Sequence, residues 1–279
     1  MRLPALIAGL VLSASSAGAA AQFNFNRLID TAKNLRQATQ EVNEQQEAEI
    51  GREYAALLVG AAPLLPNPEV QRYVNRVGRW LSLHSGRPDL NWQFGVIDSD
   101  NINAFATPGG YVLITKGLLA RLKNEAELAG VLAHEITHVE KRHHLTAMRK
   151  GAGMQAGANV LSDYLAQRSQ RSPIATERLV SGMKEVMLRG LDKDDEFEAD
   201  RVGVVIAARA GYDPYGLPSV LQMLQSLNPQ DSSLTLMFAT HPDPNARLDA
   251  LDHAIGSRLD PFASQPQAAE RYARFMQGK

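Results

Sequence analysis

The pattern H-E-x-x-H occurs at residues 134–138, inside the apolar stretch 128–139, which we expect to be a helix. At about 100° per residue, His138 lies roughly 40° around this helix from His134 and about 6 Å further along it. Both imidazoles therefore leave one face and can reach one metal ion. Glu135 lies beside them, where its carboxylate can take a proton from a zinc-activated water. The pattern predicts a zinc hydrolase; the alternative is a surface helix with two unrelated histidines.

Composition limits the classes of partner and of ligand. The 279 residues can form one large domain or two small ones, and the net charge of −1 comes without any run of Lys or Arg. This balance argues against nucleic acid as a partner. The chain has no cysteine, which excludes disulfides, a lipid anchor on cysteine and cysteine as a metal ligand. The protein ligands of a zinc ion must therefore be His, Asp or Glu.

Residues 1–21 have the organisation of a secretory signal peptide. Arg2 supplies the positive charge, residues 3–12 form an apolar run, and residues 13–21 are small, with A-x-A cleavage sites. The apolar run is too short to span a bilayer as a helix. We therefore expect export to the periplasm, no lipoprotein modification and no transmembrane segment after cleavage. An uncleaved N-terminal anchor is the alternative.

The remaining chain predicts a mostly helical α+β fold in three parts. These are an N-terminal helical extension at 22–46, a zinc metallopeptidase domain at 47–257 and a weakly specified tail at 258–279. Alternating apolar residues and turn formers predict a small antiparallel sheet beside the H-E-x-x-H helix. Its strands are expected at 92–97, 104–106 and 111–115.

The H-E-x-x-H helix has a clear start. Asn124 and Glu127 have the spacing of a capping box, and we expect the helix to continue to about Met148. Residues 151–170 are rich in Ala and Gly and are interpreted either as a packing helix or as a lid over the cleft. A further helix is expected at 176–189.

A third zinc ligand has to come from another segment, because His143 and His144 lie about 180° and 280° around a continuous helix from His134. We interpret these two as polar surface residues or as residues that support a ligand from outside. The helix expected near residue 196, capped by Asp194 or Asp195, offers Glu196 and Asp200 on one face. One carboxylate could bind zinc while the other holds the outer ring nitrogen of a ligand histidine. Glu196 as ligand with Asp200 behind it fits, and Glu198 does not. A solvated acidic face is the alternative.

Four motifs occur in order along the chain: H-E-I-T-H-V at 134–139, E-F-E-A-D-R-V-G at 196–203, A-G-Y-D-P at 210–214 and T-H-P-D-P-N-A-R at 240–247. With I-N-A-F-A-T-P-G-G at 102–110, they resemble the HtpX/BepA-type zinc metallopeptidases, gluzincins related to the CaaX prenyl endopeptidases and the Oma-type peptidases. The chain is most similar to small soluble periplasmic members. The resemblance implies a zincin-like metallopeptidase domain.

The resemblance also implies roles for particular residues. One zinc ion per chain would be held by His134, His138 and Glu196, with Glu135 as the general base and Asp200 orienting a ligand histidine. Asn103 and Ala104 would lie on the edge strand where an extended peptide pairs through main-chain hydrogen bonds.

His241 would lie over the metal cleft with Arg247 near it, and both are candidates to stabilise negative charge in the transition state. His241 could instead occupy the fourth zinc position and keep the enzyme latent.

The predicted function is zinc-dependent hydrolysis of internal peptide bonds. The substrates suggested by the resemblance are envelope or outer-membrane polypeptides that are misfolded or stalled, which is a role in protein quality control. A rival hypothesis is a periplasmic chaperone or binding module for unfolded envelope proteins, with a zinc site that is not catalytic. An intact Glu135 disfavours this rival, because a structural zinc site does not need the carboxylate. The native substrate and the oligomeric state do not follow from the residues.

Overall fold

The computed structural model describes residues 42–152, 190–241 and 243–276. The predicted signal peptide, most of the predicted extension, nearly all of the predicted lid and the helix expected at 176–189 lie outside these residues. Among the helices described, none combines the length and the apolar character that crossing a membrane requires.

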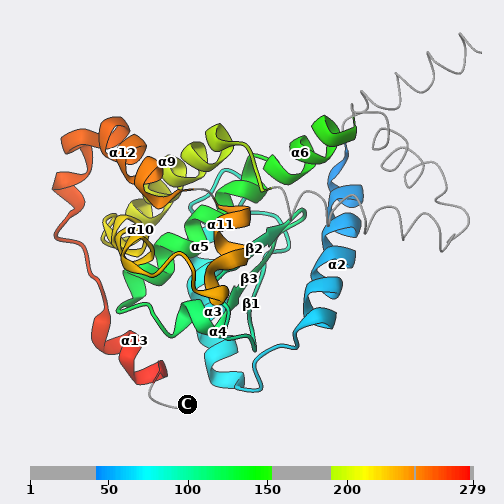
Figure 1. Ribbon diagram of the computed structural model, residues 1–279, viewed down its shortest axis with the longest axis horizontal. Coiled ribbons are helices and arrows are strands. Elements are labelled where there is room, and N and C mark those ends of the chain that lie inside the picture. The colour runs from blue at the N-terminus through cyan, green and yellow to red at the C-terminus, as the bar shows by residue number, and fades with distance from the viewer. Residues whose placement is uncertain (1–41, 153–189, 242, 277–279) are drawn as a thin grey trace, which may run out of the picture.

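A helical body surrounds one small sheet (Figure 1), so the predicted mostly helical α+β fold is confirmed. The N-terminal half contains α2 (Glu44–Ala61), α3 (Pro68–Ser82), β1 (Gln93–Ile97), β2 (Ala104–Thr107), β3 (Tyr111–Thr115), α4 (Lys116–Leu119), α5 (Glu125–Glu140) and α6 (His143–Ala152). The C-terminal half contains α9 (Lys193–Arg209), α10 (Gly216–Ser226), η1 (Ser232–Leu234), α11 (Thr235–Thr240), α12 (Pro244–Ile255), η2 (Gly256–Phe262) and α13 (Ala269–Met276).

Helix α5, which carries H-E-x-x-H, lies at the centre and is buried on nearly every side. It packs most extensively against α9, then against α10, α3 and the sheet. Glycines at these contacts, Gly130 and Gly203 among them, allow this closeness. A Cβ on Gly130 would lie 2.6 Å from the backbone nitrogen of Leu217 in α10, and one on Gly203 in α9 would lie 3.0 Å from that of His134. Because these backbones nearly touch, α9 and α10 have a fixed position relative to the two histidines.

The sheet has the order β1-β3-β2, with β3 antiparallel to β2 and parallel to β1. The prediction of a purely antiparallel sheet is therefore wrong. Only β2 and β3 form a hairpin, through a turn in which Gly109 and Gly110 have positive φ. After β1, the chain crosses to the far side of the β3 position and runs back as β2. The hairpin then returns the chain as β3 between the two, which makes β3 antiparallel to β2 and parallel to β1. This leaves β2 at the edge.

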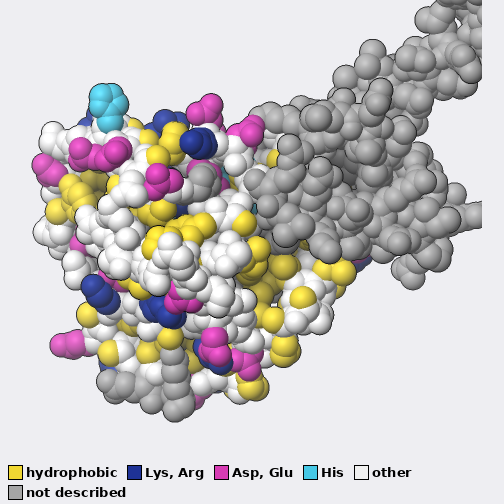
Figure 2. Space-filling model, in the orientation of Figure 1, with side chains coloured by type: hydrophobic (Ala, Val, Ile, Leu, Met, Phe, Trp, Pro, Cys, Tyr) yellow, Lys and Arg dark blue, Asp and Glu magenta, His cyan; other side chains and the backbone are white. Residues whose placement is uncertain are grey.

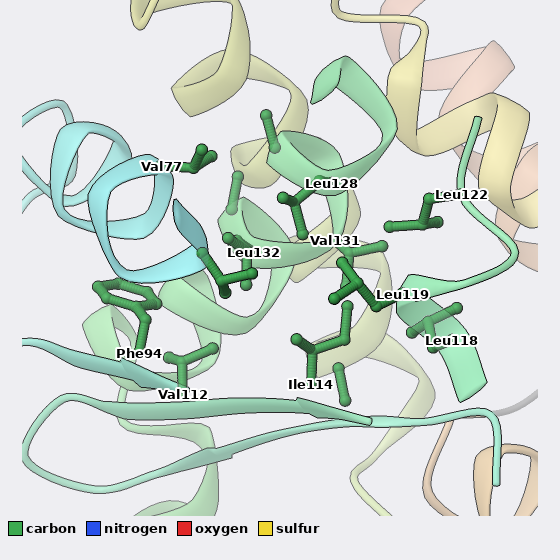
Figure 3. Packing of buried hydrophobic residues seen from close by; sticks show 14 of the residues in the cluster. Val77, Phe94, Val112, Ile114, Leu118, Leu119, Leu122, Leu128, Val131 and Leu132 are labelled. Carbon is green, nitrogen blue, oxygen red and sulfur yellow. The ribbon is translucent and has the colours of Figure 1, made fainter. Parts of the chain in front are cut away.

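Both faces of the sheet are covered. Figure 3 shows Phe94, Val112 and Ile114 pointing from one face toward Leu132 and Val131 of α5. On the other face, Phe105 and Leu113 pack against α2 and Leu236 of α11. Apolar side chains gather on the surface between α11 and α2 (Figure 2), where these elements cover the sheet. The strands are short yet held from both sides, which positions the edge strand β2 firmly beside α5.

Helix α5 ends earlier than the sequence predicts. Instead of continuing to Met148, it stops at Glu140, and Arg142 has a φ of 57° before α6 begins. Two contacts hold this break: the backbone nitrogen of Gly86 donates to Glu140 Oε2 over 2.7 Å, and Arg142 Nε lies 3.1 Å from Glu47 Oε2. The new direction lets Leu145 of α6 pack against α2. Tertiary contacts therefore outweigh the local preference for one long helix.

Helix caps agree with the sequence in part. Asn124 Oδ1 accepts from the backbone nitrogen of Glu127 over 2.8 Å, as expected, but Glu127 Oε2 accepts from Lys123 and not from Asn124. The capping box is therefore incomplete. Helix α9 begins after Asp192, two or three residues before the expected cap, and its N-cap side chain makes no capping bond. It ends, as predicted, before Gly211, whose φ is 86°.

Helix α13 is fastened to the start of α5 by a buried carboxylate. Glu125 accepts hydrogen bonds from Tyr73 over 2.6 Å, from Tyr212 over 2.7 Å and from Arg271 Nε over 2.6 Å. Burial alone would raise the pKa of Glu125, but these donors, Arg271 first, hold it below its ordinary value. The carboxylate therefore stabilises the fold above its unfolded pKa of about 4.3, and this contribution disappears as the pH falls through the lower folded value.

Replacing Arg271 by methionine is expected to lower the free energy of unfolding by about 1 kcal/mol at pH 7, because Arg271 is half exposed and solvent screens the pair. Urea unfolding at pH 7 and at pH 3 measures the effect, which should shrink at pH 3, because acid protonates Glu125 and so removes the charge that Arg271 pairs with. Arg274→Met, an exposed arginine in the same helix, is the matched control. An equal cost at both pH values would contradict the ionic role.

Candidate metal centre

Helices α5 and α9 bring the predicted ligands together. The Nε2 atoms of His134 and His138 lie 3.0 Å apart, and Glu196 Oε1 lies 3.4 Å from the Nε2 of His138. His241, at the C-terminal end of α11, completes a group whose ligand atoms all lie within 4.8 Å of one another. All four side chains are at least nine-tenths buried. His134 and His138 thus share one face of α5, as their helical spacing predicts.

The chemistry of this group fits a metal ion. Zinc–ligand distances of about 2.0–2.2 Å in a tetrahedron place neighbouring ligand atoms roughly 3–4 Å apart, as here. Glu196 Oε1 is buried without a hydrogen-bond partner among the described residues, which is costly unless a cation satisfies it. Burial and the neighbouring histidines hold the pKa of His138 well below its ordinary value, so its ring is neutral. Neutral imidazoles and a carboxylate are the forms that bind metals.

Glu196 is a carboxylate kept ionised by its surroundings. Burial alone would raise its pKa, but His241 and Arg247 lower it to about 2. His241 Nδ1 lies 3.0 Å from Glu196 Oε2, and Arg247 Nη1 lies 3.6 Å from the same oxygen. Glu196 can therefore offer negative charge to a cation at any physiological pH.

Glu135 differs from Glu196 in its surroundings. It is 2% exposed, it is not part of the four-residue group, and burial raises its pKa above the ordinary value. Its Oε1 lies 3.7 Å from His241 Nε2. A buried carboxylate with a raised pKa beside a metal site is suited to accept a proton and to release it again.

Asp200 and Arg247 lie directly behind His134. Asp200 Oδ1 is 2.9 Å from His134 Nδ1, the ring nitrogen that points away from the metal group. Arg247 donates to both oxygens of Asp200, from Nε over 2.8 Å and from Nη2 over 2.5 Å. Arg247 therefore contacts the site through Asp200 and Glu196. The sequence placed it near the cleft but did not indicate this two-bond contact.

His143 does not face away from the metal group. The prediction that it does rested on a continuous helix, and the break at Arg142 turns the side chain back, so that His143 Nδ1 lies 2.9 Å from His138 Nδ1. The ring of His144 is also near, with its centroid 5.7 Å from that of His138. Burial lowers the pKa of His144 to about 4. Nothing in the local sequence signals this break.

The two residues expected on a substrate strand lie at the beginning of β2. Ala104 is the first residue of this edge strand and lines a small pocket with His134, Glu135 and His241. The other walls are mainly aliphatic, and the pocket holds about 30 Å³. Asn103 is fully buried; its backbone is held by Thr115, and its Nδ2 has no partner among the described residues.

The site combines a histidine pair one helical turn apart, a carboxylate from a second helix and the separate buried carboxylate of Glu135. This combination defines a metal-dependent hydrolase centre of the zincin type. The chain belongs to peptidase family M48, whose profile matches residues 66–255. The match includes every residue of the metal group and all three strands, and it leaves out α2 and α13.

Two named groups of relatives agree with this family. The beta-barrel assembly-enhancing protease of Escherichia coli K12 is 34% identical over 214 residues, which are 75% of this chain and 44% of that protein. The mitochondrial metalloendopeptidase OMA1 of Arabidopsis thaliana is 30% identical over 166 residues, 59% of this chain and 32% of that protein. OMA1 of Schizosaccharomyces pombe is 29% identical over 180 residues, 64% and 51% respectively. The chain therefore spans about half the length of these relatives, or less.

Proposed function

We propose that this protein is a zinc endopeptidase that hydrolyses internal peptide bonds of polypeptides. The observation that carries the proposal is Glu135, a buried carboxylate that adjoins the His134–His138–Glu196 group without belonging to it. A site that only held a structural ion would have no use for such a group. The relatives named as proteases and metalloendopeptidases support the same activity.

Different residues of the chain have different roles in the proposed hydrolysis. His134, His138 and Glu196 would hold a zinc ion, which would supply Lewis acidity to the scissile carbonyl and to a water molecule. Glu135 accepts a proton from that water and passes it to the leaving amine. Asp200, held by Arg247, fixes the ring of His134 through its Nδ1 atom.

The edge strand β2 is the proposed place for the substrate backbone. An extended peptide that adds to a sheet edge forms main-chain hydrogen bonds without regard to sequence. Ala104 lies where that edge meets Glu135, so a peptide aligned on it passes the metal group. Asn103 precedes it and offers a buried Nδ2 that has no partner in the part of the chain that the structure describes. This arrangement supports a broad choice of unfolded polypeptides.

The biological setting is a separate proposal. The signal-like residues 1–21 support export, and the name of the Escherichia coli relative, which refers to β-barrel assembly, supports work among envelope proteins. We infer a periplasmic enzyme that removes misfolded or stalled envelope polypeptides. The periplasmic location is testable independently of the proposed peptidase activity, by locating the protein in cell fractions.

Cleavage of casein by the purified chain tests the proposed activity. We expect fragments produced by cuts within the chain, loss of all cleavage with a zinc chelator, and recovery when zinc is added back. Mass spectrometry of the fragments distinguishes internal cuts from trimming of the ends. Binding of unfolded protein without any cleavage, unaffected by the chelator, would instead support the rival chaperone function.

His241 is proposed to hold the site in a latent state. Its ring lies within the metal group and contacts Glu196, so it can take the position that a water molecule needs. His241→Ala is then expected to raise casein cleavage several-fold and to remove one nitrogen ligand seen by X-ray absorption at the zinc edge. His253→Ala, an exposed histidine on α12, is the control. If zinc coordination and cleavage both stay unchanged, His241 has no such role.

A further inference from the structure

We propose that His143 is a positioning residue for the metal site: it fixes the ring of His138 with the proton on Nδ1, so that Nε2 is free to bind the metal ion. The inference rests on the proposed zinc site and goes beyond the ligand set. It also assigns a role to Glu198, which the ligand spacing leaves without one.

The contact between the two rings is short and sheltered. Their Nδ1 atoms lie 2.9 Å apart, the ring centroids are 5.1 Å apart, and the rings are inclined by 71°. His138 is 1% exposed and His143 is 4% exposed, so water does not compete for this hydrogen bond. A nitrogen–nitrogen distance of 2.9 Å requires one donor and one acceptor.

The direction of this hydrogen bond follows from the other side of His138. Its Nε2 faces His134 Nε2 at 3.0 Å and Glu196 Oε1 at 3.4 Å, inside the metal group. To bind a metal ion there, Nε2 must present a lone pair, so the one proton of the neutral ring is on Nδ1. His138 Nδ1 therefore donates, and His143 Nδ1 accepts.

The far side of His143 agrees with this assignment. If Nδ1 of His143 accepts, its proton is on Nε2, and that atom faces carboxylates: Glu198 Oε2 at 3.4 Å and Asp195 Oδ1 at 3.8 Å. Glu198 Oε2 lies within hydrogen-bond distance and can accept from Nε2, whereas Asp195 Oδ1 is too far to accept and adds only a nearby negative charge. The order of donors and acceptors is thus consistent from Glu198 through His143 to His138.

The two ligand histidines are therefore held from outside in different ways. His134 is held directly by a carboxylate, Asp200, whereas His138 is held by the imidazole of His143 with a carboxylate beyond it. Outer contacts of this kind fix the tautomer and the ring orientation of metal ligands, and their loss typically weakens metal binding about 10–100-fold. The break at Arg142 is what brings His143 into place.

Zinc affinity of the purified full-length chain, measured by competition with a chromophoric chelator, tests the proposal. His143→Asn puts an acceptor oxygen near the position of Nδ1 and should bind zinc within about threefold of the wild type. His143→Gln puts its acceptor near Nε2, and His143→Leu has none, so both should bind about 10–100-fold more weakly. His144→Leu, the same change at a neighbour that also packs near His138, should leave affinity unchanged.

Thermal unfolding of the metal-free variants separates positioning from folding, and the Asn and Gln variants keep the comparison valid if the Leu variant does not fold. Equal affinity of the Asn and Gln variants, or wild-type affinity of a folded Leu variant, would overturn the proposal. Because cleavage is not measured, failure is distinguishable from failure of the proposed function. A wild-type chain that does not bind zinc refutes the zinc site itself, whereas tight binding insensitive to residue 143 refutes only the role of His143.

Discussion

Replacement of Glu135 by glutamine is expected to reduce casein cleavage by about 10²–10⁴-fold, the range that general acid–base groups contribute. Glutamine has the same size but cannot accept the proton that hydrolysis must remove from water. Because Glu135 is outside the four-residue metal group, zinc content and thermal stability should stay close to those of the wild type. The measurement is the initial rate of casein cleavage at saturating zinc, with zinc content determined on the same preparation.

The matched control is Glu140→Gln, the same change in the same helix at a side chain that contacts Gly86 and not the metal group. It should retain cleavage. Full activity of Glu135→Gln would exclude this carboxylate as the base. Loss of zinc together with loss of activity would mean that Glu135 is needed for the site to form, which is a different role from the one proposed.

Replacement of Arg247 by methionine is expected to have the largest effect on stability. Arg247 is 4% exposed, and it makes a two-bond contact with Asp200 and approaches Glu196, so its loss leaves two buried carboxylates without their cation. Breaking a buried ion pair costs about 3–5 kcal/mol. For a domain of this size that corresponds to a fall of about 6–20 °C in Tm. Thermal unfolding of the metal-free protein measures it.

Arg209→Met serves as control, because Arg209 is exposed at the end of α9 and should change Tm little. The sequence suggested Arg247 as a stabiliser of negative charge in the reaction, and its contacts suggest that it also supports the ligands. If Arg247→Met keeps the wild-type Tm and loses only cleavage, the catalytic role alone is correct. An unchanged Tm would contradict the account of a buried, paired charge.

Local helical spacing predicted the part of the site that lies on single helices. His134 and His138 share a face because four residues make about one turn, and Glu196 and Asp200 point the same way for the same reason. These relations do not depend on the rest of the fold. The spacing alone therefore makes Glu196 a candidate third ligand.

Features that depend on contacts between distant segments were not predictable in this way. The parallel pairing of β1 with β3 follows from the path of the chain between strands, which no residue pattern records. The break after Glu140 depends on Glu47 and Gly86, which are far away in sequence. Angles on an unbroken helix leave His143 either as a surface residue or as one that supports a ligand from outside, and only the break brings it to His138 Nδ1.

The central claim is that His134, His138 and Glu196 hold one catalytic zinc ion. The most direct measurement is a titration of the metal-free chain with zinc, with casein cleavage and bound zinc followed in the same samples. We expect cleavage to rise in proportion to bound zinc and to reach its plateau at one zinc ion per chain. A chain that binds zinc at this site without cleaving at any ratio, or that cleaves fully without zinc, would contradict it.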